Sequence, residues 1–311
     1  MNVLVTGGAG FIGSHMVDAL VEQGHRVTVV DDLSTGLAAN VDARAIIERV
    51  DVRDAGAIGA AAVRARPDVV IAMAASVDVC GSVDDPALDA STNVIGSLNT
   101  FLAGARNGAR LMIYSSTGGA LYGESPDPAT EETPVHPLSP YGIAKHAAEL
   151  YLSWVCARYG VAGTVLRYAN VYGPRQNGSG GGGVVAAFAD RLLGGVQPIV
   201  YGDGLQTRDF VYVDDVVRAN LLALEGPPGT YNIGTGTSTS ILELGRLCCI
   251  ACGRDAGVEM RPGRSGEVHD SVLDSTRAAR ELGWQPRTRL TDGLRSTLDW
   301  YAAMARGADH A

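Results

Sequence analysis

Residues 2–20 read NVLVTGGAGFIGSHMVDAL, and this stretch decides the fold. An apolar run at 2–6, typical of a buried strand, leads into a glycine-rich turn, and the turn opens an apolar helix. Gly7, Gly10 and Gly13 fit the spacing GxxGxxG. Glycines in such a turn let the backbone approach a pyrophosphate, which the positive helix N-terminus attracts. The stretch therefore predicts a dinucleotide-binding strand–turn–helix.

An acidic residue closes the next apolar run. Asp31 stands 18 residues after Gly13, at the end of RVTVVD. A carboxylate here can accept hydrogen bonds from both adenosine ribose hydroxyls, but it would repel a 2′-phosphate. The chain has no arginine between Val27 and Arg44 that could bind such a phosphate. The pattern favours NAD over NADP as the cofactor.

Short β-rich runs alternate with helical runs through the first half of the chain. The strands are apolar throughout, which is typical of a parallel sheet covered by helices on both faces. We expect an α/β fold, a doubly wound (Rossmann) parallel sheet with a smaller C-terminal α/β domain that binds the substrate. Glycine and proline become frequent after about residue 170. The expected Rossmann domain is 1–170 plus about 209–225, and the second domain is about 171–208 plus 226–311.

Composition excludes several classes of protein. The formal net charge of −9 argues against a nucleic-acid partner, because neutralising phosphates needs a basic face. No apolar run reaches about 18 residues, so no membrane span is expected, and the start MNVLVTGG does not resemble a signal peptide. The five cysteines suit a reducing cytoplasm. Cys249 and Cys252 form a CxxC in an apolar run without a second cysteine pair or a nearby histidine, so we expect buried apolar residues and no metal.

The stretch SPYGIAKHAAEL, residues 139–150, holds the only lysine of the chain beside 24 arginines. Ser139 suits a helix N-cap and Pro140 a first helical position, so Tyr141 and Lys145 share one helix face. An ammonium about 5 Å from a phenol contributes roughly 3 kcal/mol at an effective dielectric of about 20, or about 2 pK units. Tyr141 is therefore expected to act as a general base near neutral pH. The alternatives are an exposed helix pair and a lysine that is here by chance.

These motifs resemble the extended short-chain dehydrogenases/reductases, and most of all the UDP-glucose 4-epimerases. The matching segments run nearly end to end: TGGAGFIGSH, DDLSTG, VDVRD, SSTGGALYGE, SPYGIAK, ANVYGPRQ, YGDGLQTRDFVYVDDVV, YNIGTGTSTS, RSGEVHDSVLD and LGWQP. The resemblance implies that Thr117 is the catalytic hydroxyl and Tyr141 the base. It also implies that Lys145 holds both Tyr141 and the nicotinamide ribose.

The same resemblance implies two sets of binding residues. The cofactor would contact Gly7, Gly10, Phe11, Ile12, Gly13, Asp31, Asp32, Ser34, Thr35, Gly36, Asp51, Val52, Ala74, Ala75, Asn93, Ser115, Tyr141, Lys145 and Tyr168. The nucleotide-sugar would contact Thr117, Tyr141, Asn170, Val184, Val185, Tyr201, Arg208, Arg264 and Ser271. Among these, Arg208 and Arg264 would bind the diphosphate, and Ser271 would border the C2 substituent of the sugar.

The residues directly after Thr117 indicate the reaction. Relatives that dehydrate the sugar carry Asp-Glu after the catalytic threonine, and UDP-glucuronate decarboxylases carry a glutamate, whereas this chain reads Gly118-Gly119-Ala120. Without a second proton-transfer group, a 4-keto sugar can only turn over and be reduced again, so we expect epimerisation at C4. An acid supplied from elsewhere would restore the alternatives: a dehydratase, a decarboxylase, a net reductase or a UDP-glucuronate 4-epimerase. A non-catalytic NAD sensor is a further alternative.

Two expectations concern the size of the sugar that the site accepts. The small Ser271 favours N-acetylated sugars beside UDP-glucose and UDP-galactose. The glycine-rich residues 177–183 form either an adjustable segment beside the substrate or a flexible surface loop.

Helices around 88–106 and 141–159 carry apolar residues on more than one side (Leu88, Ile95, Leu98, Leu102, Ala144, Ala148, Tyr151, Val155). Relatives dimerise through these helices, which implies a homodimer, unless both helices are buried within one chain.

Overall fold

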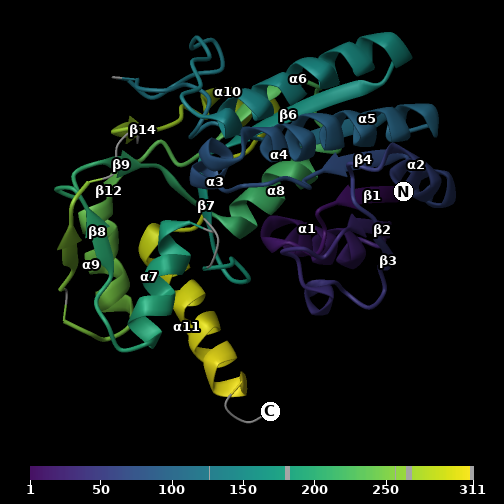
Figure 1. Ribbon diagram of the computed structural model, residues 1–311. Helices are drawn as coiled ribbons and strands as arrows, with labels where there is room; N and C mark the ends of the chain where they lie inside the picture. Colours follow the sequence, from purple (N-terminus) through teal and green to yellow (C-terminus); the bar gives the residue numbers. More distant parts are fainter. Residues whose placement is uncertain (126, 179–182, 256, 264–267, 309–311) are drawn as a thin grey trace.

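A parallel seven-stranded sheet carries the larger part of the molecule (Figure 1). The structure is a computed structural model that describes residues 1–125, 127–178, 183–255, 257–263 and 268–308. The sheet runs in the order β11-β6-β5-β4-β1-β2-β3, and every neighbouring pair is parallel. Its strands are β1 (Asn2–Thr6), β2 (Arg26–Asp31), β3 (Ile46–Arg49), β4 (Val69–Ala72), β5 (Leu111–Thr117), β6 (Ala162–Tyr168) and β11 (Thr230–Ile233). This arrangement confirms the expected doubly wound fold.

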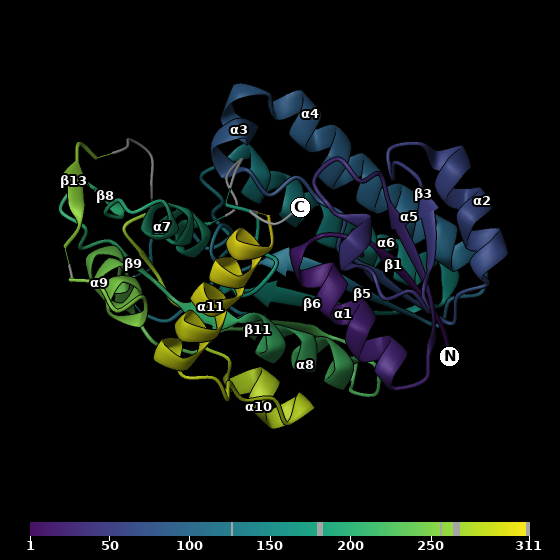
Figure 2. The ribbon, with the colours of Figure 1, turned by 90° about the horizontal axis from the view of Figure 1, so that it is seen from below.

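Helices cover both faces of the sheet, because its strands are apolar on both sides (Figure 2). One face carries α1 (Phe11–Glu22), α8 (Val213–Ala223) and α10 (Thr276–Leu282). The other carries α2 (Ala55–Ala65), α5 (Ser97–Arg106) and α6 (Pro140–Tyr159). Ahead of α5 lie α3 (Val79–Asp84), α4 (Pro86–Ala90) and the π-helical segment η2 (Ser91–Gly96), and the short 3₁₀ helix η1 (Ala38–Asn40) follows β2.

The start of α6 follows from its capping residues. The Gly142 N–H donates to Ser139 Oγ at 3.1 Å, and Pro140 occupies the first turn, where no amide hydrogen is needed. The helix ends at Gly160, whose φ of 69° is the left-handed conformation that glycine adopts without strain. The expectation that a helix begins at Ser139-Pro140 is therefore confirmed.

A smaller group of elements packs around its own apolar cluster, at the lower left of Figure 1. Its helices are α7 (Val184–Leu193), α9 (Ile241–Ala251) and α11 (Leu290–Ala308). Its short strands are β7 (Asn170–Tyr172), β8 (Ile199–Tyr201), β9 (Thr207–Arg208), β10 (Phe210–Tyr212), β12 (Thr239–Ser240), β13 (Glu259–Arg261) and β14 (Asp270–Ser271). Cys249 lies buried in this cluster as expected, together with Cys248, whereas Cys252 is only half-buried against it.

One expected boundary needs correction. The sequence pattern places the segment after residue 225 in the second domain, but β11 pairs with β6 and forms an edge of the main sheet. Trp284 and the α10 residue Leu282 also pack into the core of that sheet. We therefore propose that the larger domain includes β11 and α10. Within the described part of the chain, no helix is both long enough and apolar enough to cross a membrane.

Candidate active site

The predicted cofactor residues gather at the carboxyl edge of the sheet, where the strand order reverses. The chain runs outward from β1 through β2 to β3, and in the opposite direction from β4 through β5 to β6. Ligands of doubly wound folds bind in the crevice at such a switch point. Gly7 follows β1 with a φ of 71°, and a Cβ placed on it would lie 2.7 Å from the backbone nitrogen of Ala74, which follows β4. The two loops therefore meet with no room for a side chain between them.

The glycine turn leaves the N-terminus of α1 open. Gly10 precedes Phe11 and offers no side-chain cap, so the first amide groups of the helix are not bonded by a capping side chain. A Cβ on Gly13 would collide with the Gly7 carbonyl oxygen, so the turn can pack this tightly only with glycine there. An uncapped helix N-terminus behind a turn without side chains fits a dinucleotide pyrophosphate.

Asp31, the last residue of β2, is hydrogen-bonded to this turn. Its carboxylate is 7% exposed, and it accepts hydrogen bonds from the Ala9 N–H and the Leu33 N–H, each at 2.9 Å. A carboxylate has about four lone-pair sites, so acceptors for ribose hydroxyls remain. Gly36 completes the wall, since a Cβ there would lie 2.9 Å from Ala9. These residues fit NAD.

The other cofactor candidates fall into exposed and buried groups. Asp32 accepts from the Ser34 N–H and hydroxyl, and Thr35 beside them is exposed, whereas Asp51 is paired with Arg53 at 2.6 Å. Val52 is buried against Gly96.

Asn93 is fully buried in η2, and it both accepts from the Ser76 N–H and donates to the Ser76 carbonyl, each at 2.9 Å. Because π-helical turns are frequent at functional sites, this clamp on the loop after β4 supports a role for Asn93.

Thr117, Tyr141 and Lys145 meet at the end of β5. The side chain of Thr117, the last residue of that strand, acts on the Tyr141 phenol and lowers its pKa, against the larger effect of burial. Lys145 is 3% exposed, and its Nζ donates to the Ser115 carbonyl at 2.6 Å and lies 4.4 Å from the centre of the Tyr114 ring. The structure thus brings the three predicted catalytic side chains to one place.

The expected effect on the tyrosine was wrong in direction. Burial, and after it the charge of Asp89, raises the pKa of Tyr141 above the usual value of a phenol. Burial also lowers the pKa of Lys145 to about 7, against the opposing effect of Glu149 and Asp89. Sequence reasoning counted the attraction of Lys145 for a phenolate, but it did not count the loss of water around either group.

Sequence reasoning also missed a buried charge network behind the site. Arg167 of β6 donates from Nε to Glu149 Oε1 at 3.0 Å and from Nη2 to Oε2 at 2.6 Å. Ser116, next to Thr117, donates to the same Oε1 at 2.6 Å. The signal was visible, because Glu149 stands four residues after Lys145 and so shares its helix face. Asp89 carried no such signal, since it is far from Lys145 in the sequence.

Tyr168 and Ser115 form a second buried pair. The two hydroxyl groups lie 3.0 Å apart, and Asn220 of α8 donates to the Tyr168 hydroxyl at 2.8 Å. Both residues were predicted to contact the cofactor. The structure places them at the carboxyl ends of β5 and β6, where they connect the sheet to α8.

Part of the predicted substrate set converges on Gly119. A Cβ placed there would lie 3.3 Å from Asn170 Oδ1 and 3.8 Å from Ser271 Oγ. Arg208 is the register partner of Ser271 across β9 and β14, and its Nη1 donates to the Thr207 and His269 carbonyls. Gly119 therefore faces the same space as the predicted sugar-binding side chains.

Three further predicted substrate residues lie on α7 and β8. Val185 is buried in α7, Val184 begins that helix, and Tyr201 ends β8 in a different sheet from Arg208. Arg264 and most of the glycine-rich residues 177–183 lie outside the described residues.

The two glycines after Thr117 differ in their surroundings. A Cβ on Gly118 would lie 2.5 Å from Leu273 Cδ1 and 2.7 Å from Cδ2. Leu273 is 1% exposed and belongs to the core of the main sheet. The space that a side chain at 118 would need is therefore filled, whereas position 119 opens toward Asn170 and Ser271.

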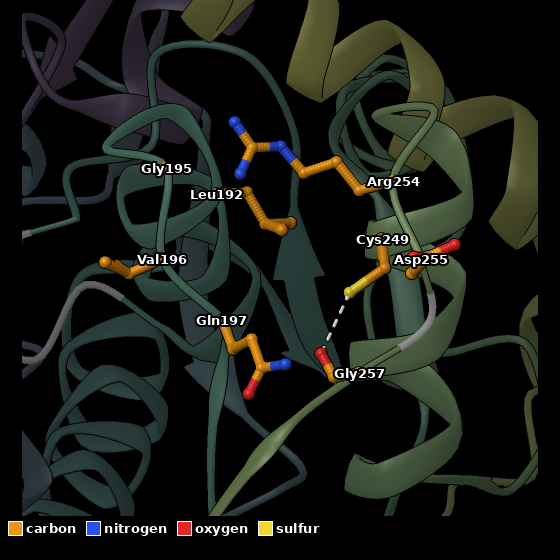
Figure 3. A pocket seen from close by; sticks show the side chains of 8 residues that line it. All are labelled: Leu192, Gly195, Val196, Gln197, Cys249, Arg254, Asp255 and Gly257. Carbon is orange, nitrogen blue, oxygen red and sulfur yellow. Dashed lines mark hydrogen bonds between the residues drawn. The ribbon is translucent and has the colours of Figure 1, made fainter.

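Two cavities are lined by none of the predicted catalytic residues, although Leu273 lines the second of them. One of about 240 Å³ is in the smaller group of elements, lined by Leu192, Gly195, Val196, Gln197, Cys249, Arg254, Asp255 and Gly257 (Figure 3). There the Cys249 thiol points to the Gly257 carbonyl at 3.5 Å, as drawn in Figure 3. Another of about 330 Å³ lies between Gly234–Gly236 and Trp284. Neither contains a predicted catalytic residue.

Comparison with known proteins gives consistent matches. Residues 3–234 match the NAD dependent epimerase/dehydratase family. A UDP-glucose 4-epimerase from Mycolicibacterium smegmatis is 42% identical over 310 residues, covering 97% of this chain and 98% of the relative.

Two solved structures are also similar to this chain over nearly its whole length. A UDP-glucose 4-epimerase from Thermotoga maritima with UDP-glucose superposes with a TM-score of 0.96 at 46% identity, covering 98% of this chain and 100% of that one. The Thermus thermophilus UDP-glucose 4-epimerase in complex with NAD gives a TM-score of 0.93 at 42% identity, with coverage of 97% and 99%.

Proposed function

Because the chain belongs to the NAD dependent epimerase/dehydratase family, we propose that it inverts C4 of a UDP-hexose through a transient 4-keto sugar. The observation that carries the proposal is the pair of glycines after Thr117. Both reactions in the family name, epimerisation and dehydration, share the oxidation at C4. They differ in whether a second group moves a proton afterwards.

The turn after Thr117 has no side chain that could carry out a second proton transfer. Leu273 fills the space beside Gly118, so an acidic side chain there would need the core to rearrange. Position 119 has room, but it carries no side chain. With no acid or base in this turn, the keto sugar keeps its C5 proton and its C6 hydroxyl, and only the return of the hydride is left.

The residues of the chain then have separate tasks. Tyr141 accepts the proton of the C4 hydroxyl, and Thr117, whose side chain acts on the same phenol, orients that hydroxyl. Lys145, held by the Ser115 carbonyl, places a positive charge in the same buried space. The glycine turn and Asp31 would hold NAD⁺, which would supply a reversible hydride acceptor for C4 and a positive charge beside the phenol that opposes the effect of burial on the pKa of Tyr141.

Inversion also requires that the sugar ring turn over while the nucleotide stays bound. Gly119 leaves open space beside Asn170 and Ser271, which suits such a rotation. Arg208 lies in register with Ser271, which suits contact with the diphosphate of the same ligand. By the family resemblance, Arg264 would be its second cationic partner.

Ser271 further suggests which sugars fit. A serine fills much less space than the tyrosine that glucose-restricted relatives hold at this place. A shortened wall admits a larger ligand unless the site collapses around it. We therefore extend the proposal to the UDP-GlcNAc and UDP-GalNAc pair, and expect Ser271→Tyr to abolish turnover of that pair while the unsubstituted pair still reacts.

The proposal is tested by product analysis. UDP-glucose, UDP-GlcNAc and UDP-glucuronate are each incubated with the NAD-loaded enzyme, and products are separated by chromatography and weighed by mass spectrometry. Epimerisation gives a product of unchanged mass and no net absorbance change at 340 nm. Loss of water or of carbon dioxide would identify a dehydratase or a decarboxylase, and accumulating NADH would identify a net dehydrogenase. Tyr141→Phe is the inactive control.

The same chain is proposed to form a homodimer. Apolar side chains on α4, η2 and α6 are 46–60% exposed, among them Leu88, Ile95, Leu150 and Trp154. On α6 the opposite stripe, Ala144, Ala148 and Val155, is buried against the sheet. The outward stripe is therefore available to a second copy of the chain.

A further inference from the structure

Asp89 is a buried carboxylate for which the proposed reaction has no use. It lies on α4 and is 2% exposed. Its Oδ1 accepts from Asn93 Nδ2 at 2.8 Å, and its buried Oδ2 has no hydrogen-bond partner among the described residues. Burying a carboxylate oxygen away from water and without a hydrogen-bond partner costs free energy, so its burial needs a physical reason.

Asp89 can provide a negative charge that stabilises the ammonium of Lys145. The ammonium of Lys145 is also buried, and its two close contacts, the Ser115 carbonyl and the Tyr114 ring, carry no full negative charge. A buried lysine without a compensating anion tends to lose its proton. Its cationic form therefore needs a carboxylate in the same low-dielectric region.

Asp89 on α4 and Glu149 on α6 are the two buried carboxylates here, because α4 packs against the helix that carries Lys145, and they are not equivalent. Glu149 is already engaged at both oxygens by Arg167, and His146 lies 3.5 Å from its Oε2. Tyr114, whose ring lies against the Lys145 ammonium, is a neutral phenol because burial raises its pKa. On the helices α3 and α5, which also pack against α6, the titratable residues Cys80, Asp84 and Arg106 are exposed. Asp89 alone among these acids is both buried and free of a cationic hydrogen-bond partner.

We infer that Asp89 is a positioning residue: its negative charge keeps the Lys145 ammonium protonated inside the buried site, and its Oδ1 holds Asn93 in place. The inference deepens the proposed function, on which its catalytic meaning rests. It also accounts for the single lysine, because an ammonium balanced by a carboxylate at longer range can gain or lose its proton. An arginine would remain charged whatever its surroundings.

The decisive experiment measures the protonation of Lys145 itself. Because the chain has one lysine, protein made with [ε-¹³C]lysine gives one lysine signal, whose shift is followed from pH 5 to pH 10 by NMR. Asp89→Asn removes the charge and keeps an oxygen that can accept from Asn93. We expect its titration midpoint to fall by about one pH unit, the effect of one charge within ~10 Å at an effective dielectric of about 20.

Asp85→Asn is the matched control. It removes one negative charge from the same short helix, at an exposed N-cap position where asparagine caps as well as aspartate. Its midpoint should stay at the wild-type value. A midpoint unchanged in Asp89→Asn, or one that moves equally in both variants, would overturn the inference. If Asp89→Asn does not fold, Asp89→Leu removes the same charge with a side chain of similar size.

Activity then tests the catalytic meaning separately. The alkaline limb of the kcat profile of Asp89→Asn should move to lower pH with the NMR midpoint, so that lowering the pH restores turnover. A limb that does not follow the midpoint would show that the charge of Asp89 has no part in the reaction. A wild-type enzyme that epimerises no nucleotide-sugar would refute the proposed function, while the NMR result would still decide whether Asp89 keeps Lys145 protonated.

Discussion

Leu273 occupies the space that a side chain at Gly118 would need, with its Cδ1 2.5 Å from the position of an added Cβ. The contact joins the turn after the catalytic strand to the segment after β14. Leu273 also forms an isolated parallel bridge with Ala129, and its N–H donates to Asp209 at 3.4 Å. Gly118 is thus a packing position, although it directly follows Thr117.

Gly118→Ala should destabilise the protein by about 1–3 kcal/mol, because the added methyl group overpacks a filled core. Chemical denaturation gives the value. Gly119→Ala is the matched control, since its Cβ would meet nothing closer than 3.3 Å. In a double-mutant cycle with Leu273→Ala, the two changes should be less damaging together than the sum of their separate effects. Additive effects would show that the contact is not the cause.

Gly119→Ala should show the converse behaviour. Its stability should stay near that of the wild type, while kcat/KM for the nucleotide-sugar falls, because the methyl group enters the space shared by Asn170 and Ser271. Steady-state kinetics with UDP-glucose and UDP-GlcNAc measure the effect, and the larger sugar should lose more. Equal and unchanged kinetics for both sugars would place the sugar elsewhere.

Tyr141→Phe should lower kcat by about 10²–10⁴-fold while NAD stays bound, because only the proton acceptor is removed. Lys145→Arg should also be severely impaired. Lys145 is buried between the Ser115 carbonyl and the Tyr114 ring, and a planar guanidinium is larger and cannot release its proton. Turnover and bound cofactor are measured on the same preparations. Near-normal turnover of Lys145→Arg would show that the only lysine is there by chance.

Local signals explain which parts of the fold and site could be predicted. The glycine turn, Asp31 and the helix start at Ser139-Pro140 are each determined by residues close together in the sequence. Continuously apolar strands separated by helices then indicate the parallel sheet. Because the carboxyl ends of parallel strands share one edge, residues at the ends of β1, β2, β5 and β6 had to come together.

The features that sequence reasoning missed depend on contacts between distant segments. The pKa of Tyr141 depends on its burial and on Asp89, which comes from another helix. The packing of Gly118 depends on Leu273, near the other end of the chain. β11 follows the glycine- and proline-rich EGPPG and is only Thr230–Ile233 long, so nothing local distinguishes an edge strand of the main sheet from a strand of the second domain.

Glu149→Gln should cost about 3–5 kcal/mol of stability, because it leaves the buried guanidinium of Arg167 without its counter-charge. Urea unfolding compares it with Glu48→Gln, which breaks the exposed pair between Glu48 and Arg64 and should cost at most about 1 kcal/mol. Both glutamates receive two hydrogen bonds from an arginine, but Glu149 is buried and also accepts a hydrogen bond from Ser116. Equal losses in the two variants would show that burial does not set the strength of the Glu149 pair.

Trp154→Glu should convert the proposed dimer into a monomer. Trp154 is 55% exposed on α6 and Leu150, one turn earlier, is 60% exposed, so a carboxylate at this place would be buried without a partner in the interface. Light scattering at micromolar concentration measures the mass of each variant. Ile250→Glu is the matched control, because Ile250 is equally exposed, at 63%, but lies on α9 in the smaller group of elements. It should leave the dimer intact. A wild-type protein that is already monomeric, or dissociation of both variants alike, would refute an interface on α6.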